Sequence, residues 1–137
     1  MIKDFSNKKI TVLGAGRSGI GIAKLLKKNN ATVFVSDSSP KEKLMYLDEN
    51  VFQNYYIDYE LGRNSDKIYD AEAIVVSPGI SPNSDLLKKA EKRDIKILSE
   101  VEVSSYFCEV PIIAITGTNG KTTTTELTGA ILREAGY

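Results

Sequence analysis

A glycine-rich turn between a strand-like and a helix-like segment constrains the fold of this chain more than any other feature. Residues 9–13 (KITVL) form a β-branched apolar run of strand length, and residues 19–28 carry apolar side chains at helical spacing. The turn at residues 14–19 (GAGRSG) joins them. Glycines at these three positions permit a tight turn, close approach of backbone to a phosphate, and close packing of helix on strand. The turn therefore predicts a nucleotide-binding strand–turn–helix unit.

The rest of the chain continues this alternation of strands and helices. Strand-like runs occur at 32–36, 73–77, 96–98 and 112–116, and helices are predicted at 41–47, 81–93, 100–107 and 121–135. Residues 50–70 match neither period and are expected to mix strand and loop. Such alternation is typical of a parallel sheet covered by helices on both faces. We therefore expect an α/β, Rossmann-like fold.

Two further features are expected at the same edge of this sheet. Asp37 follows the second strand, where a carboxylate can accept hydrogen bonds from a sugar or a base. Residues 77–79 (SPG) follow another strand and should reach the carboxyl edge, where open α/β sheets bind ligands. A nicotinamide dinucleotide and a UDP-sugar fit these features equally well. A glycine turn needed only for packing, and a simple turn at Pro78 and Gly79, remain alternatives.

A second glycine-rich loop, residues 117–123 (GTNGKTT), follows the strand-like run at 112–116 and opens a helix. It lacks the common P-loop spacing, because Ile115 stands five residues before Gly120. It nevertheless contains glycines that allow clustered N–H donors, the Lys121 ammonium, and the Thr122 hydroxyl for Mg²⁺. Four consecutive threonines, residues 122–125, are poor helix formers, which favours a phosphate-binding role over an ordinary helix entry.

The amino-acid composition argues against several classes of function. The 137 residues include eighteen basic and eighteen acidic side chains, which argues against a nucleic-acid-binding protein. There is no histidine, so the commonest general base and metal ligand is absent. The single cysteine, Cys108, cannot form an internal disulfide, and neither a signal peptide nor a membrane span is predicted. We therefore expect a cytoplasmic protein that binds neither nucleic acid nor membrane.

The motifs, in this order, resemble the Mur ligases of peptidoglycan precursor synthesis. The resemblance runs from about residue 9 to residue 136 and is carried by residues 14–19 with Asp37, by 77–80 (SPGI) and by 115–123 (ITGTNGKTT). Thr122 and Thr123 after the lysine differ from the related loop of folylpolyglutamate synthases. Within the family, the motifs are most similar to those of the members that add D-glutamate.

The resemblance implies a UDP-binding domain over residues 1–98 and the truncated start of a central ATP-binding domain, with its first strand, P-loop and helix, over 99–137. It assigns eight residues to the UDP group: Gly14, Ala15, Gly16, Arg17, Ser18, Asp37, Ser38 and Gly79. Of these, Asp37 and Ser38 would lie near the uracil. It assigns seven to the ATP phosphates: Gly117, Thr118, Asn119, Gly120, Lys121, Thr122 and Thr123. Among these, Lys121 would be the catalytic group and Thr122 the Mg²⁺ ligand. Ser39 stands where some members have a basic residue that stacks on the base.

The reaction implied by the resemblance uses ATP to phosphorylate the terminal carboxylate of UDP-N-acetylmuramoyl-L-alanine, after which the amine of D-glutamate attacks the acyl phosphate. A chain of this length is expected to be inactive alone. The full-length enzyme is expected to be a monomer, whereas exposure of Leu127, Ile131 and Leu132 would let the fragment self-associate. The alternatives are an NAD-binding domain of an oxidoreductase or regulatory sensor, and a non-catalytic phosphate-binding module.

Overall fold

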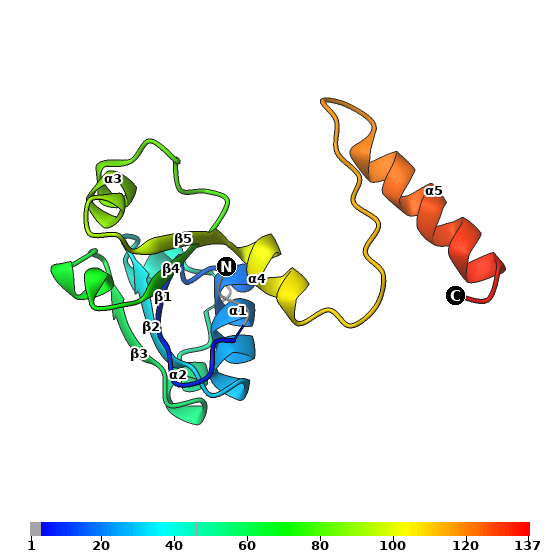
Figure 1. The fold of residues 1–137 in the computed structure, drawn as a ribbon. Coiled ribbons are helices and arrows are strands. Elements are labelled where there is room, and N and C mark those ends of the chain that lie inside the picture. The colour runs from blue at the N-terminus through cyan, green and yellow to red at the C-terminus, as the bar shows by residue number, and fades with distance from the viewer. Residues whose placement is uncertain (1–3, 46) are drawn as a thin grey trace. The chain divides into compact units, whose positions relative to one another are not determined.

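The structure, a computed structural model, describes residues 4–45 and 47–137 (Figure 1). The chain forms two compact units, Met1–Phe107 and Cys108–Tyr137. The first unit contains the sheet and most of the helices, and the second contains one long helix and the segment before it.

The first unit is built on a sheet of five parallel strands. These are β1 (Lys9–Leu13), β2 (Thr32–Asp37), β3 (Asp58–Leu61), β4 (Ala73–Val76) and β5 (Lys96–Ser99). Their order is β3-β2-β1-β4-β5, and every neighbouring pair is parallel. The order reverses between β1 and β4, which is the topological switch point at which ligands of open α/β sheets bind. The predicted α/β, Rossmann-like fold is confirmed.

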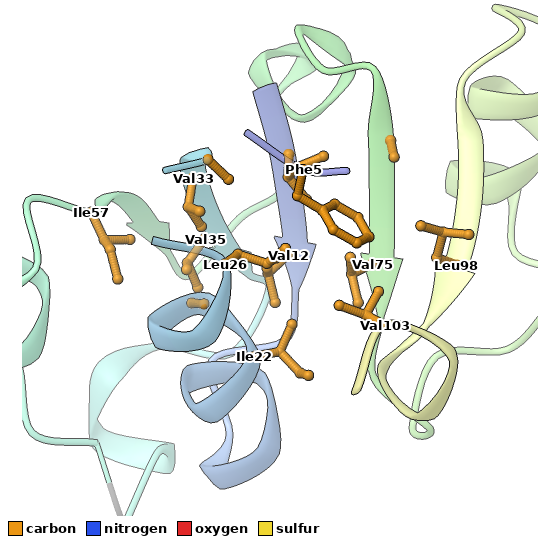
Figure 2. Close-up of a cluster of buried hydrophobic side chains, with 14 of the residues drawn as sticks. Phe5, Val12, Ile22, Leu26, Val33, Val35, Ile57, Val75, Leu98 and Val103 are labelled. Atoms are coloured by element: carbon orange, nitrogen blue, oxygen red, sulfur yellow. The ribbon is translucent and has the colours of Figure 1, made fainter. Parts of the chain in front are cut away.

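Helices cover both faces of this sheet. On one face lie α1 (Arg17–Lys28), α2 (Asn50–Asn54) and α4 (Glu100–Tyr106), and on the other lie α3 (Asp85–Glu91) and the 3₁₀ turn η2 (Asp66–Tyr69). The larger core lies under the first set, where Ile22 and Leu26 of α1 and Val103 of α4 pack against Val12 and Val75 of the sheet (Figure 2). This packing fixes the start of α1 against the end of β1, and so fixes the glycine turn between them.

Two predicted helices are shorter in the structure. The helix predicted at 81–93 spans only Asp85–Glu91, because Ser84 rather than Ser81 caps it: the Ser84 hydroxyl accepts the Leu87 N–H at 3.4 Å. The segment predicted as a helix at 41–47 forms only the 3₁₀ turn η1 (Lys41–Lys43). Both segments lie beside the carboxyl edge of the sheet.

The second unit consists of α5 (Lys121–Glu134) and the extended segment before it. The strand predicted at 112–116 is not formed. Residues 108–137 contain no second strand for it to pair with, and a strand is defined by its pairing. α5 buries none of its residues within this unit, and Leu127 and Ile131 are about 60% exposed. Self-association through this face stays a prediction.

The division into domains after residue 98 also stays a prediction. In the structure, α4 packs into the core of the first unit through Val103, so this unit continues to Phe107. Among the described residues, no helix combines the length and the apolar character needed to cross a membrane.

Candidate functional site

A cavity of about 470 Å³ lies at the carboxyl edge of the sheet, at the switch point between β1 and β4. The turns that follow β1, β2 and β4 line it, as the parallel topology requires. It contains six of the eight residues predicted to bind UDP: Gly14, Gly16, Ser18, Asp37, Ser38 and Gly79. The other two, Ala15 and Arg17, line a neighbouring cavity of about 280 Å³.

The glycines of the turn fall into two groups. Gly14 has φ +110°, and a Cβ there would lie 2.4 Å from the Ser77 hydroxyl oxygen. A Cβ at Gly19 would lie 2.1 Å from the carbonyl oxygen of Gly14. Both glycines are therefore required by the packing of β1, β4 and α1 on one another. This requirement explains two of the three glycines without any ligand.

The packing of the protein does not explain Gly16. Its φ of −71° suits any residue, and a Cβ there would meet no atom within 4 Å. The same open space surrounds a Cβ built at Gly79, which also lines the cavity. These two positions form a cradle that side chains would fill, as expected where backbone must come close to a phosphate.

The start of α1 supplies donors to this cradle. Gly16 caps the helix without any side-chain hydrogen bond, and the first turn has no acidic residue. The first N–H of α1 to donate a helical hydrogen bond is that of Ile20, which donates to the Gly16 carbonyl at 3.0 Å. The N–H groups of Arg17 and Ser18 precede it and have no acceptor among the described residues. With the positive end of the helix dipole, they suit an anion.

The Asp37 carboxylate joins two of the loops that line the cavity. Its Oδ2 accepts the Ala15 N–H at 2.7 Å, and its Oδ1 accepts the Ser39 N–H at 2.7 Å. The acidic residue predicted to contact a sugar or base thus holds the glycine turn against the loop after β2. Contact with the nucleotide stays a prediction.

A buried polar network lies under the β2 side of the cavity and was not predicted. The Ser36 hydroxyl, fully buried, donates to Glu60 Oε1 at 2.9 Å, and its oxygen lies 2.7 Å from the side-chain amide of Asn64. The Ser65 N–H donates to Glu60 Oε1 at 2.8 Å. Ser36 and Asn64 also line the cavity. The sequence signal for Asn64 was weak, because residues 50–70 follow no clear period.

The charge on Glu60 is stabilised where it lies. Burial by itself would raise the pKa of Glu60. Hydrogen bonds from Ser65 and Ser36, together with the nearby Arg63 guanidinium, more than offset this and hold the pKa of Glu60 below its ordinary value. The network therefore contains a carboxylate at neutral pH.

On the β4 side, Ser77 is fixed by Glu100, another buried carboxylate that sequence reasoning missed. The Ser77 hydroxyl donates to Glu100 Oε1 at the start of α4. The same hydroxyl occupies the space in which a Cβ at Gly14 would lie. By holding Ser77 in place, Glu100 therefore stabilises the packing around the glycine turn.

The second glycine loop belongs to the second unit. Gly117 and Gly120 have φ values of +155° and +76°, and Gly120 caps α5 without a side-chain hydrogen bond. Lys121 Nζ donates to the Gly117 carbonyl at 2.6 Å, so the side chain folds back over the loop. The other predicted phosphate-binding residues, Thr118, Asn119, Thr122 and Thr123, are exposed. Their role, and that of Lys121, stays a prediction.

The residues that the structure describes contain no group of three or more histidine, cysteine, aspartate or glutamate side chains placed to hold a metal ion. The Thr122 hydroxyl makes no hydrogen bond to any described residue. It therefore remains available for the Mg²⁺ role predicted for it, which is untested.

The all-parallel sheet, its switch-point cavity and its glycine turn define the chain's first unit as a Rossmann-like α/β domain. Residues 9–86 match the family model described as the MurD N-terminal domain, and the chain belongs to this family. The resemblance to the Mur ligases is thereby confirmed.

Curated relatives agree with this assignment. The chain is 43% identical over 130 residues to the UDP-N-acetylmuramoylalanine--D-glutamate ligase of Christiangramia forsetii, covering 94% of this chain and 28% of that protein. It is 37% identical over 134 residues to the protein of the same name from Chloroherpeton thalassium, covering 98% of this chain and 28% of that protein. The chain thus spans little more than a quarter of the length of these relatives.

Among solved structures, shikimate dehydrogenase from Aquifex aeolicus has a similar fold. The TM-score is 0.52 at 21% sequence identity, over 81% of this chain and 53% of the dehydrogenase. At this identity the likeness concerns the fold alone.

Proposed function

We propose that this chain is the nucleotide-binding part, with the first loop of the ATP-binding part, of a ligase that adds D-glutamate to UDP-N-acetylmuramoyl-L-alanine in the cytoplasm. The observation that carries the proposal is the family match over residues 9–86, together with relatives of that name at about 40% identity. The switch-point cavity supports it independently, because it has the open glycines and free N–H groups that a diphosphate needs.

In this proposal, the diphosphate lies over Gly16 and against Gly79, where the backbone leaves room for it. The N–H groups of Arg17 and Ser18 are the donors, and Arg17 lines the neighbouring cavity. The nucleoside extends towards Asp37 and Ser38, since the residue at the end of the second strand contacts the ribose end of nucleotides in folds of this type.

The second loop is proposed to bind ATP through residues 117–123. The first-turn N–H groups of α5 and the Lys121 ammonium would hold the phosphates, and the Thr122 hydroxyl would bind Mg²⁺. Mg²⁺ would supply charge neutralisation on the phosphates. Lys121 would release the Gly117 carbonyl, to which it now donates, and would stabilise negative charge on the phosphoryl group as it transfers to the L-alanine carboxylate. The amine of D-glutamate then displaces phosphate from the acyl phosphate, which forms the amide.

The chain alone is proposed to bind the UDP group without ligating. It spans little more than a quarter of its relatives, and amino-acid selection would depend on residues outside it. Calorimetric titration with UDP-N-acetylmuramoyl-L-alanine and, separately, with NADH tests the proposal. We expect saturable binding of the first ligand only. Saturation by NADH alone would instead favour the alternative, an NAD-binding domain of an oxidoreductase or regulatory sensor.

The ATP part has its own test. Titration of the chain with ATP and Mg²⁺, followed by NMR, should shift the amide resonances of residues 121–123. Lys121→Ala should weaken this binding about tenfold, as expected for loss of one charge-assisted contact. Lys92→Ala, an exposed lysine beyond α3, is the matched control and should leave it unchanged.

A further inference from the structure

The loop after β4 supplies a part of the cavity wall that the proposed UDP contacts leave largely unused. Besides Gly79, its residues Ile80, Ser84 and Leu86 line the cavity. In the proposed function, the diphosphate lies over Gly16 and against Gly79, and the nucleoside extends towards the loop after β2. The β2 side is then occupied, so the group attached to the second phosphate extends along the β4 side, where these three residues lie.

This loop is held in place by hydrogen bonds within the first unit. The Ile80 N–H donates to the Ser77 carbonyl at 3.0 Å, which closes a turn directly after β4. At the other end of the loop, Ser84 caps α3, and the Leu86 carbonyl accepts the Tyr69 hydroxyl at 3.2 Å. The side chains that line this part of the cavity are therefore positioned before a ligand binds.

Ile80 and Leu86 make this part of the wall apolar. Both are half-buried, and both pack against the smaller of the two cores, which contains Leu87 and Ala90 of α3. Each aliphatic side chain is thus anchored by the core and also lines the cavity. A sugar hydroxyl gains little from apolar surface, whereas a methyl group placed against it is removed from water, which is favourable.

Ser84 adds a hydrogen-bond donor to the same wall. Its hydroxyl oxygen accepts the Leu87 N–H at 3.4 Å, but its proton has no acceptor among the described residues. A hydroxyl donor combined with two aliphatic side chains matches the two parts of an acetamido group. The carbonyl oxygen of that group needs a donor when it leaves water, and its methyl group needs an apolar contact.

We infer that Ile80, Ser84 and Leu86 form a subsite for an acetamido group on the sugar of the bound nucleotide, and that they select N-acetylhexosamines over unsubstituted hexoses. This inference rests on the proposed function, which places the diphosphate of a UDP-sugar between Gly16 and Gly79. The Ser84 donor alone could equally serve a sugar hydroxyl, so the selection comes from the apolar wall together with the donor. Apolar contacts discriminate one added methyl group only modestly, which sets the size of the expected effect.

Calorimetry with UDP-glucose and UDP-N-acetylglucosamine tests the subsite, because these ligands differ only in the hydroxyl or acetamido group at C2 of the sugar. The wild-type chain should bind the acetamido ligand about tenfold more tightly, through one buried methyl group and one hydrogen bond. Leu86→Ala and Ile80→Ala should each lower this preference about two- to threefold and change the affinity for UDP by less than about twofold. Leu127→Ala, the same change at an exposed leucine of α5, is the control and should leave the preference unchanged.

Ser84→Asp separates the donor from the helix cap. Aspartate can accept the Leu87 N–H as serine does, but at neutral pH it has no proton to donate to a carbonyl oxygen. The preference for the acetamido ligand should therefore fall about two- to fivefold while α3 keeps its cap. Both ligands carry the same diphosphate, so the effect of the added charge on phosphate binding cancels in the ratio of their affinities.

Thermal unfolding identifies the variants that are folded, and binding is compared among these. Equal affinity of the wild-type chain for the two sugar nucleotides, or an unchanged preference in Leu86→Ala, Ile80→Ala and Ser84→Asp, would overturn the inference and leave the proposed function intact. Failure of the wild-type chain to bind UDP would overturn the proposed function and this inference with it.

Discussion

The Asp37 carboxylate at the end of β2 accepts the backbone N–H of Ala15, in the turn after β1, at 2.7 Å. Its second oxygen accepts the Ser39 N–H at the same distance. One side chain therefore sets the spacing between the proposed diphosphate site and the proposed nucleoside site. It also consumes the Ala15 donor, so binding of an anion depends on the N–H groups that follow it in the turn.

Replacing Asp37 with Asn should loosen both loops. The amide can accept only one of the two N–H groups, and its own NH₂ opposes the other. We expect a loss of about 1–2 kcal/mol of unfolding free energy and UDP binding weakened about tenfold, measured by denaturation and calorimetry. Asp58→Asn, an exposed aspartate on β3, should change neither. Weaker UDP binding with unchanged stability would mean instead that Asp37 acts only by contacting the nucleotide.

Gly16→Ala should remove nucleotide binding without removing stability. The added Cβ meets no protein atom and the backbone φ of −71° accepts alanine, so the loss of unfolding free energy should not exceed about 1 kcal/mol, the effect of replacing glycine by alanine at a helix N-cap. A diphosphate over the turn would collide with the new methyl group. We expect UDP affinity to fall at least about tenfold, which corresponds to about 1.4 kcal/mol of binding free energy.

The matched control for this change is Gly21→Ala. Gly21 lies in α1, its Cβ position is equally open, and it does not line the cavity. Alanine there should raise stability by about 0.5–1 kcal/mol, because glycine is the poorer helix former, and should leave UDP affinity unchanged. If both substitutions weaken binding alike, the effect comes from α1 as a whole and the phosphate cradle is wrongly placed.

The central strands were predictable because they are buried on both faces. β1 and β4 have apolar side chains pointing both ways, and such runs are recognisable without knowledge of their partners. The glycine turn was predictable for a similar local reason, since it must join strand and helix within a few residues. The predicted cavity follows from these two features and from parallel topology.

The features that could not be predicted depend on pairing with other segments of the chain. β3 has the sequence DYEL and buries only Glu60, so its strand character comes from pairing with β2 rather than from its own pattern. Asn64 follows that strand, and it was not predicted as a cavity residue for the same reason. At 112–116 the prediction of a strand was wrong for the opposite reason. This apolar run has the length of a strand, but its own unit offers no strand for it to pair with.

Gly19→Ala should destabilise the first unit strongly. The new Cβ would lie 2.1 Å from the Gly14 carbonyl oxygen, a backbone atom that cannot move without shifting β1 against α1. We expect a loss of about 1–3 kcal/mol, typical of overpacking at a tight contact. Urea denaturation measures it. A variant as stable as the wild type would show that the turn can relax, and the packing role of Gly19 would have to be abandoned.

Glu60→Gln should change how stability depends on pH. The folded pKa of Glu60 is lowered from the ordinary 4.5, so its contribution is complete above pH 4.5 and is lost as the pH falls through the folded value. Glutamine keeps an oxygen to accept the Ser65 N–H but cannot be protonated there. The difference in stability between wild type and variant, measured by urea denaturation from pH 7 down to pH 3, should therefore shrink with acidification. Asp66 and Glu72, whose pKa values are also lowered by lysine partners, contribute equally to both proteins and cancel in this difference. A difference that stays constant over the range would mean that the charge of Glu60 contributes nothing to the fold.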